Sequence, residues 1–171
     1  MKNKTILFIH QNFPAQFKSL APKLANDKIY DIHSLSLKSN TSSPELPDHL
    51  LSINNITHHQ YIIEKSSSDS IHLFAQEFET KMIRAEAVAK ECFKLKENGL
   101  IPDLIIDHPG WGETFFIKEI WPDSKILSYF EFYYNTVNSD VDFDVNEFEL
   151  PLTGFDLFAR LRARNAPGLM S

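Results

Sequence analysis

Cysteine and long apolar runs are what this sequence of 171 residues lacks most clearly. Its single cysteine, Cys92, excludes a disulfide within the chain and the zinc sites that need several thiolates, and it is typical of a reducing compartment. No apolar stretch approaches the roughly 18 residues of a membrane-spanning helix. The basic start is followed by an apolar run too short for a signal peptide. These absences predict a cytoplasmic protein.

Glycine and positive charge are also scarce. The five glycines form neither of the phosphate-binding patterns G-x-G-x-x-G and G-x-x-x-x-G-K-[ST], and the nucleophile elbow G-x-S-x-G is missing too. The 17 basic residues are outnumbered by 23 acidic ones, which gives a formal net charge of −6. Nucleic acids bind basic surfaces, so no nucleic-acid partner is expected.

What the sequence does have is an alternation of apolar segments and helical patterns. Hydrophobic residues make up 43% of the chain, enough for one domain with a buried core. Five segments are predicted as strands, namely 4–10, 30–37, 55–64, 100–107 and 125–134. Helical patterns lie between or after them, at 15–27, 70–96, 112–123 and 154–171. This order predicts a Rossmann-like, three-layer α/β/α domain with a mainly parallel sheet.

Two of the predicted helices have an apolar stripe. In the first, Phe17, Leu20 and Leu24 fall at helical spacing, and Pro22 is expected to shorten or bend the helix. The longest helix has a stripe that we interpret as core only, formed by Phe74, Phe78, Met82, Ala85, Ala89 and Cys92. Gly99 is expected to close that helix, because glycine readily adopts the left-handed conformation found at helix ends.

Polar and aromatic side chains gather where three of the predicted strands end. The first strand ends in His10–Phe13, the fourth in Asp107–Glu113 and the fifth in Glu131–Tyr134. Parallel strands bring their carboxyl ends to one edge of a sheet, and ligands bind outside that edge in open α/β folds. We therefore expect a ligand site there, with Gly110 and Gly112 giving the backbone a sharp turn and room for a ligand.

Each residue of this expected site also has a purely structural interpretation. His108 either caps a turn or contacts a ligand. Trp111 either packs or offers a face for stacking, and Glu113 either caps the next helix or acts in the site. Glu131 lies among aromatic residues, so its carboxylate is either exposed at the strand end or held by a partner.

A metal site is an alternative for the same edge. His58, His59, Asp107 and His108 are each capable of ligating a metal, but no spacing among them is diagnostic. A metal-dependent hydrolase would use His10, Asp107, His108 and Glu131. A second alternative is a non-catalytic Rossmann-like module that binds a partner or ligand, which the missing phosphate-binding glycines favour.

Three long motifs resemble a known family. They are "ILFIHQNFPAQFKSLAPKLA" (6–25), "DHPGWGETFFIKEIWPDSKILSYFEFYY" (107–134) and "FDLFARLRARNAP" (155–167). Together they resemble the N-terminal domain of a bacterial branch of family 4 glycosyltransferases. The resemblance implies the two-domain glycosyltransferase B architecture, in which two Rossmann-like domains face each other across a cleft.

The resemblance also implies a function. It implies a retaining glycosyltransferase without a metal or other cofactor, in which a C-terminal domain binds the nucleotide-sugar donor and this domain binds a saccharide, lipid-linked or protein acceptor. Peripheral association with the inner face of the membrane is part of that expectation. His108 and Glu131 are the candidate catalytic residues. The candidate substrate-binding residues are His10, Gln11, Asn12, Phe13, Gly110, Trp111, Gly112, Glu113, Tyr133 and Tyr134.

The sequence departs from the family pattern in three respects. Many relatives have a glycine-rich turn after the first strand, where this chain has Ala15 and no glycine. Many also have a histidine after the fifth strand, where this chain has "YFEFYY". Two-domain members are about twice as long or longer, so residues 1–171 are expected to form only the acceptor-side domain, inactive by itself and without the donor-binding domain.

Overall fold

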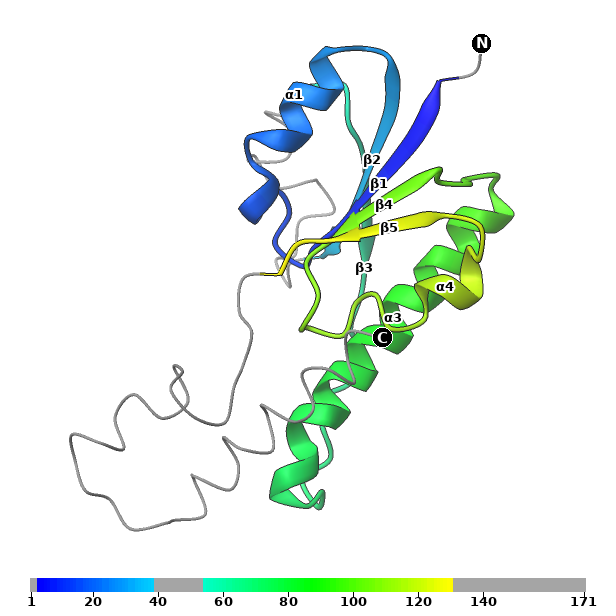
Figure 1. The fold of residues 1–171 in the computed structure, drawn as a ribbon. Helices are drawn as coiled ribbons and strands as arrows, with labels where there is room; N and C mark the ends of the chain where they lie inside the picture. The colour runs from blue at the N-terminus through cyan, green and yellow to red at the C-terminus, as the bar shows by residue number, and fades with distance from the viewer. Residues whose placement is uncertain (1–2, 39–53, 131–171) are drawn as a thin grey trace, which may run out of the picture.

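The computed structural model describes residues 3–38 and 54–130 and has a fully parallel sheet of five strands (Figure 1). The strand order is β3-β2-β1-β4-β5, and neighbouring strands are parallel throughout. The bounds are Lys4–Ile9 (β1), Tyr30–Leu37 (β2), Thr57–Tyr61 (β3), Leu104–Asp107 (β4) and Lys125–Ser128 (β5). The prediction of a Rossmann-like α/β fold is confirmed. Residues 39–53, the predicted helix at 154–171 and the site candidates Glu131, Tyr133 and Tyr134 lie outside the described residues.

Helices cover both faces of the sheet, and the direction of each crossover decides which face. The chain moves one way from β1 to β2 through α1 (Leu20–Asn26), and the opposite way from β3 to β4 and from β4 to β5. Right-handed crossovers in opposite directions place their helices on opposite faces. Accordingly α3 (Gln76–Glu97) and α4 (Ile117–Ile120) share the face opposite α1.

Two apolar clusters fill the layers between the sheet and its helices. On the α3 and α4 face the buried residues are Leu7, Ile9, Leu35, Tyr61, Val88, Cys92, Leu95, Ile105, Ile117, Ile120 and Trp121. On the α1 face they are Ile6, Phe8, Phe13, Phe17, Ala21, Ala25, Ile32 and Ile106. Because strand side chains alternate between faces, neighbours such as Leu7 and Phe8 belong to different clusters. Burial of β1 and β4 on both faces explains why their sequences are almost continuously apolar.

The first helix is shorter than predicted. A 3-10 turn, η1 (Ala15–Phe17), precedes α1, and Pro22 lies in the first turn of α1, where a missing N–H is tolerated. Phe17 is buried as expected, but the prediction for Leu20 was wrong, since that side chain is exposed. The small side chains of Ala21 and Ala25 face the sheet instead, which lets the short helix pack closely.

The long helix α3 is also corrected at its N-terminal end. The first regular turn is a 3-10 turn, η2 (Leu73–Ala75), and the α-helix begins at Gln76 rather than near 70. Figure 1 shows its first turns extending beyond the strands, so no sheet lies beneath them. Phe78 is therefore 47% exposed, and the predicted stripe is core only in its C-terminal half.

The end of α3 matches the prediction from Gly99. The residue has φ +91°, and the Leu100 N–H donates to the Leu95 carbonyl at 2.9 Å. This hydrogen bond closes the last turn and directs the chain into β4. By contrast, α4 spans only four residues of the predicted 112–123, because residues before Ile117 form turns. Among the described residues, no helix is long and apolar enough to cross a membrane.

Candidate functional site

The turns after β1 and β4 meet at the carboxyl edge of the sheet. Ile9 and Asp107, the last residues of these strands, are register partners. The next residues, His10 and His108, have ring centroids 5.2 Å apart. The expectation that the two turns lie at one edge is thus confirmed, and it follows from the parallel pairing of two adjacent strands. The contact of Glu131 with this edge stays a prediction.

Both histidines are buried and packed against aromatic rings. The centroid of Phe17 lies 6.2 Å from that of His10, and the centroid of Tyr129 lies 6.3 Å from that of His108. Phe17 and Tyr129 are themselves 6.5 Å apart, so the four rings form one cluster at the strand ends. The His108 side chain is only 8% exposed, so most of its ring lies inside this cluster.

Asp107 fixes the position of the β4 end. The Ser128 hydroxyl donates to Asp107 Oδ1 at 2.6 Å, and the Tyr129 N–H donates to the Asp107 carbonyl at 2.8 Å. Burial raises the pKa of the Asp107 carboxyl above its ordinary value, and the hydrogen bond from Ser128 opposes that rise. The two bonds join the ends of β4 and β5, so the residue that follows Asp107 is held in place.

The turn after β1 contains four predicted substrate-binding residues, His10–Phe13. One of them, Phe13, belongs to the core. The Asn12 N–H donates to His10 Nδ1 at 2.9 Å; Asn12 is exposed and Gln11 is half-buried. Phe13 has no exposed surface and packs 5.9 Å from Phe8, centroid to centroid. The assignment of Phe13 to substrate binding was therefore wrong, because the turn directs its ring into the core.

The turn after β1 contains no glycine, yet it has a glycine-like backbone at Ala15. Ala15 has φ +37°, in the left-handed region that costs most residues about 1–2 kcal/mol. The turn after β1 thus contains a left-handed residue that is alanine rather than glycine.

The two glycines of the β4–α4 turn have different structural roles. Both have positive φ, +108° for Gly110 and +97° for Gly112. Among the described residues, a Cβ on Gly110 would meet nothing within 4 Å, whereas a Cβ on Gly112 would lie 2.9 Å from the carbonyl carbon of Lys81 in α3. The interpretation that Gly112 makes room for a ligand is corrected, since helix α3 occupies that space. Gly110 borders open space, as a ligand-facing residue should.

Trp111, between the two glycines, is held at the surface by α3. Its side chain is 46% exposed. The Arg84 guanidinium lies 5.7 Å from the centre of the indole ring, and Arg84 Nη1 donates to the Trp111 carbonyl at 2.7 Å. Trp111 therefore presents an indole surface to solvent next to the turn that carries His108.

Glu113 is a buried link rather than a helix cap. The residue is only 3% exposed, and Glu113 Oε1 accepts hydrogen bonds from the Gln11 N–H at 3.1 Å and from the Tyr61 hydroxyl at 3.3 Å. In the part of the chain that the structure describes, no side chain caps α4. The helix-cap interpretation was wrong, because the carboxylate instead accepts hydrogen bonds from the turn after β1 and from the end of β3. Burial raises the pKa of Glu113 above its ordinary value of 4.5, and the charge of Arg84 opposes that rise.

Sequence reasoning missed the partners of these residues. Tyr61 ends β3, and Arg84 lies in the middle of α3, where the sequence shows an ordinary helical charge. Neither is near residues 107–113 in sequence. Tyr61 is fully buried, and a buried tyrosine hydroxyl needs a hydrogen-bond partner. This requirement indicates a polar contact for Tyr61, but it becomes visible only in the structure.

The histidines of β3 pair with β2 rather than with the strand ends. The Ser34 hydroxyl lies 2.6 Å from His58 Nδ1, and His33 Nδ1 lies 2.9 Å from His59 Nε2. Burial, with His33 next in weight, lowers the pKa of His59 to about 4. Within residues 3–38 and 54–130, no group of three or more histidine, cysteine, aspartate or glutamate side chains is arranged to hold a metal ion.

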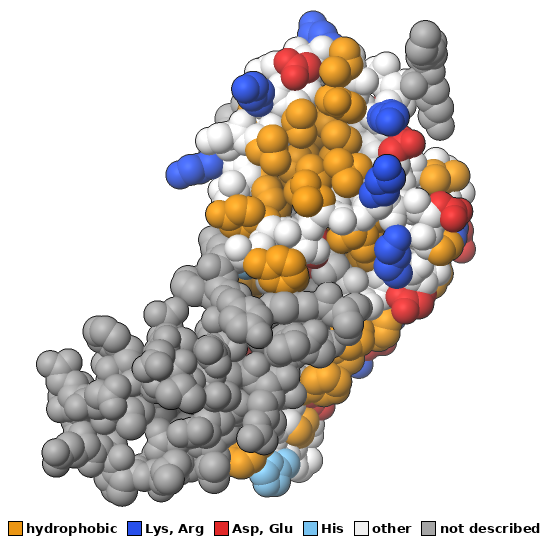
Figure 2. Space-filling view, viewed as in Figure 1, with side chains coloured by type: hydrophobic (Ala, Val, Ile, Leu, Met, Phe, Trp, Pro, Cys, Tyr) orange, Lys and Arg blue, Asp and Glu red, His pale blue; other side chains and the backbone are white. Residues whose placement is uncertain are grey.

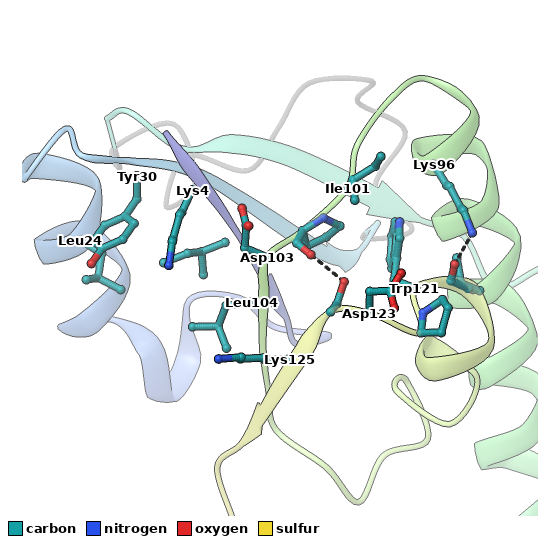
Figure 3. Close-up of a pocket in the computed structure, with 15 residues that line it drawn as sticks. Lys4, Leu24, Tyr30, Lys96, Ile101, Asp103, Leu104, Trp121, Asp123 and Lys125 are labelled. Carbon is teal, nitrogen blue, oxygen red and sulfur yellow. Dashed lines mark hydrogen bonds between the residues drawn. The ribbon is translucent and has the colours of Figure 1, made fainter. Parts of the chain in front are cut away.

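A large hollow among the described residues lies at the opposite edge of the sheet. A cavity of about 740 Å³ opens beside the amino ends of β1, β4 and β5. Figure 3 shows Lys4, Leu24 and Tyr30 on one side of it and Trp121 on the other. Its Trp121 indole and Ser124 hydroxyl donate to backbone carbonyls, so these polar groups are already satisfied by the fold.

An apolar surface lies next to this cavity. Figure 2 shows hydrophobic side chains gathered on one face, with basic and acidic side chains around them. Leu127 of β5 is exposed, whereas Leu24 and Leu104, which line the cavity, are partly buried. Parallel sheets are normally covered on both faces. We take as the candidate site the carboxyl edge, where the turns after β1 and β4 bring His10 and His108 together.

Two of three comparisons with known proteins found a match. A family model described as "Glycosyl transferase family 4 group" matches residues 32–171. Among solved structures, UGT2 of Phytolacca americana, complexed with UDP-2fluoro-glucose and pterostilbene, is similar with a TM-score of 0.54 and 10% sequence identity. That match covers 89% of this chain and 36% of the other, so this chain spans little more than a third of that protein. No curated protein sequence matches this one. At such low identity the structural likeness shows the fold alone.

Proposed function

The chain belongs to the glycosyl transferase family 4 group, and on that basis we propose that it is the acceptor-side domain of a retaining glycosyltransferase. The complete enzyme moves a sugar from a nucleotide-sugar donor to a saccharide, a lipid-linked saccharide or a protein. The similar plant protein was solved with UDP-2fluoro-glucose, which is a nucleotide sugar, and with pterostilbene. That pair of ligands supports a site in which a donor and a second molecule are bound together.

One observation supports placing the proposed site at the carboxyl edge of the sheet. His10 and His108 come from separate strands and lie with their ring centroids 5.2 Å apart at the carboxyl edge. A neutral imidazole donates a hydrogen bond from one nitrogen and accepts one at the other, as a sugar hydroxyl also does. We assign to His108 a hydrogen bond with the transferred sugar or the acceptor hydroxyl, and Asp107 holds the strand end that positions it.

Trp111 is the proposed stacking platform. Its indole is about half exposed and fixed to α3 through Arg84. The apolar face of a sugar ring packs well against such a rigid aromatic surface. The open space beside Gly110 lies in the same turn. Together they support a saccharide, rather than a small ion, as the ligand of this edge.

The donor is bound mainly by a second domain in this proposal. The transition state then forms between the two domains, where groups from both orient the reactants and stabilise charge on the departing nucleotide diphosphate. Glu131, Tyr133 and Tyr134 are further candidates for the acceptor side, and they lie outside the described residues. Metal independence, a cytoplasmic location and association with the inner face of the membrane belong to the proposal too.

Replacing His108 in an enzyme that contains both domains tests the proposed role. His108→Phe keeps a ring against His10 and Tyr129 but removes both nitrogens. Losing a hydrogen bond to a buried reacting group costs on the order of 1–3 kcal/mol, which corresponds to transfer about 5- to 150-fold slower. The melting temperature should change little, because the ring packing stays. Unchanged transfer by a folded variant would show that His108 is structural only.

A further inference from the structure

The face of the sheet that carries α1 is only partly covered by helix. Helix α1 packs mainly against β2, and among the described residues no helix lies over β5 on this face. Leu127 of β5 is the register partner of Ile106, which belongs to the apolar cluster on the α1 face, so both side chains lie on that face. Ile106 is 4% exposed, whereas Leu127 is 56% exposed. Because parallel sheets are normally covered on both faces, the β5 side of this face lacks a cover.

Apolar side chains continue from β5 towards α1 (Figure 2). Leu104 of β4 lines the cavity at the amino edge, as does Leu24 of α1. Leu20 lies four residues before Leu24 and therefore on the same side of the helix, and it is 42% exposed. These three residues and Leu127 form what we call the α1–β5 surface. Exposed apolar side chains that gather in this way mark a place where another chain segment or molecule binds.

Two lysines border the α1–β5 surface. Lys125 is the register partner of Leu104 and lies on the same face, and Lys4 lines the cavity together with it. Among the described residues, neither lysine has an ion pair. Of the carboxylates that line the cavity, Asp103 accepts a backbone N–H of β1, and Figure 3 shows Asp123 on the opposite side. The surface is therefore apolar with a positive border, and it suits an apolar segment that carries negative charge.

The chain leaves β5 on the side of this surface. Tyr129 directly follows β5, and its ring centroid lies 6.5 Å from that of Phe17, a member of the apolar cluster on the α1 face. Residues 131–171 continue from this point. An extended chain of the length of 131–139 spans at most about 30 Å, whereas β5 is about 13 Å long. The residues that follow 139 can therefore reach every part of the α1–β5 surface.

The segment 140–150, which reads DVDFDVNEFEL, matches this surface in pattern and in charge. Its first half alternates aspartate with Val141, Phe143 and Val145, which gives an extended chain one apolar and one acidic side. The sequence from 131 to 150 has no basic residue and six acidic ones, namely Glu131, Asp140, Asp142, Asp144, Glu147 and Glu149. The predicted helix at 154–171 also has apolar residues, but it carries three arginines and would bring positive charge to the two lysines.

We propose that the α1–β5 surface is a docking site for residues 140–150 of the same chain. The apolar side of this segment packs against the leucines, and its aspartates pair with Lys4 and Lys125, whose long side chains let the ammonium groups reach the acidic side. The docked segment covers the β5 side of the sheet and the mouth of the amino-edge cavity. That cavity is then a seat for the chain itself rather than a ligand pocket. The inference does not depend on the proposed glycosyl transfer.

A spin label on the 171-residue chain, read by NMR without any sugar, tests this docking. Asn146→Cys places the label beside the alternating run and removes no apolar or acidic side chain. Cys92 is buried, so only the new thiol reacts. We expect loss of the amide signals of β5 and retention of those of β3, which lies four strand spacings, about 19 Å, farther away. Asn165→Cys, in the predicted helix, is the matched control and should leave the β5 signals in place.

Two variants of Leu127 test the charge match in the chain labelled at residue 146. Leu127→Glu puts a carboxylate against the acidic segment and should restore the β5 signals. Leu127→Lys is equally polar with the opposite charge and should keep more of the signal loss. Because Leu127 is more than half exposed, both variants should fold. Equal recovery of the β5 signals in the two variants would contradict the charge match.

Three results would overturn the proposal. Unchanged β5 signals with the label at residue 146 would show that the segment does not reach the surface. Loss of those signals with the label at residue 165 alone would assign the surface to the predicted helix. Loss in a mixture of spin-labelled chains and separate isotope-labelled chains would assign it to a second copy. Since no sugar is present, failure here leaves the proposed function standing, and failure of the His108 transfer test leaves the docking standing.

Discussion

Two glycines in the turn after β4 show how neighbouring residues of one type are retained for different physical reasons. Gly110 and Gly112 both have positive φ, which favours glycine wherever it occurs. Only Gly112 also lies against a backbone, that of Lys81 in α3. Its missing side chain lets the turn approach the helix, and this approach brings Trp111 to Arg84.

Alanine at these positions should separate the two reasons. Gly110→Ala should destabilise the chain by about 1–3 kcal/mol, the usual cost of a strained backbone conformation. Gly112→Ala should cost at least about 1 kcal/mol more, because the new Cβ forces α3 and the turn apart. Urea denaturation of both variants gives the difference. Equal losses would mean that the turn moves away from Lys81 without resistance.

The buried carboxylate of Glu113 makes stability depend on pH. Burial raises the pKa of Glu113 above 4.5 in the folded chain. The folded state therefore binds the proton more tightly than the unfolded state, and stability is lost as pH rises through the folded pKa. The wild type should become steadily less stable relative to Glu113→Gln from about pH 4.5 towards neutrality, while Asp107 contributes equally to both. A constant difference in unfolding free energy across that range would contradict the assignment.

At the residue scale, the sequence predicted where the polar groups are but not which way they point. His10 and His108 were identified because parallel strands end at one edge, and this rule needs no side-chain detail. Phe13 and Glu113 were misassigned because the dihedral angles of their turns decide whether a side chain enters the core. The partners of Glu113, Tyr61 and Arg84, come from elements far away in sequence, and no local pattern identifies them.

At the scale of elements, α3 shows that an apolar stripe becomes core only where something lies beneath it. Its buried positions are Ala85, Val88, Cys92 and Leu95, above the strands. The stripe continues back to Phe78 with the same spacing, but the sheet does not. The sequence predicted all five strands, the long helix and its end at Gly99, since periodicity and glycine chemistry are local. It could not predict the length of sheet under the helix.

A pair of alanine variants in α3 should reverse the order expected from side-chain size. Val88→Ala removes a fully buried side chain from the main core cluster and should cost about 2 kcal/mol. Phe78→Ala removes a larger but half-exposed side chain and should cost less than about 1 kcal/mol. Chemical denaturation monitored by circular dichroism measures both. A greater loss of stability for Phe78→Ala than for Val88→Ala would contradict this expectation. It would mean that the Phe78 ring makes stabilising apolar contacts away from the sheet.

At the scale of the whole molecule, the proposed chemistry needs more than these 171 residues. The chain covers 36% of the similar plant glycosyltransferase-type structure, and a transition state formed between two domains cannot be stabilised by one of them. We expect no sustained sugar transfer by the chain alone and weak or no binding of nucleotide sugars. A panel of nucleotide sugars, with release of the nucleotide as the measured product, checks this, and repeated turnover by the chain would refute it.

The central claim is that saccharides bind at the carboxyl edge, and the two tryptophans of the chain mark the two edges in question. Trp111 is 46% exposed at the carboxyl edge, whereas Trp121 is 3% exposed and lines the cavity at the amino edge. Each variant with a single tryptophan, Trp121→Phe or Trp111→Phe, therefore reports on one edge through its fluorescence.

Titrating both variants with a panel of saccharides is the most direct test. The account predicts a saturable change in emission from Trp111 in the Trp121→Phe chain and none from Trp121 in the Trp111→Phe chain. A response from Trp121 alone would move the ligand to the opposite edge of the sheet, and no response from either tryptophan would contradict saccharide binding by this domain.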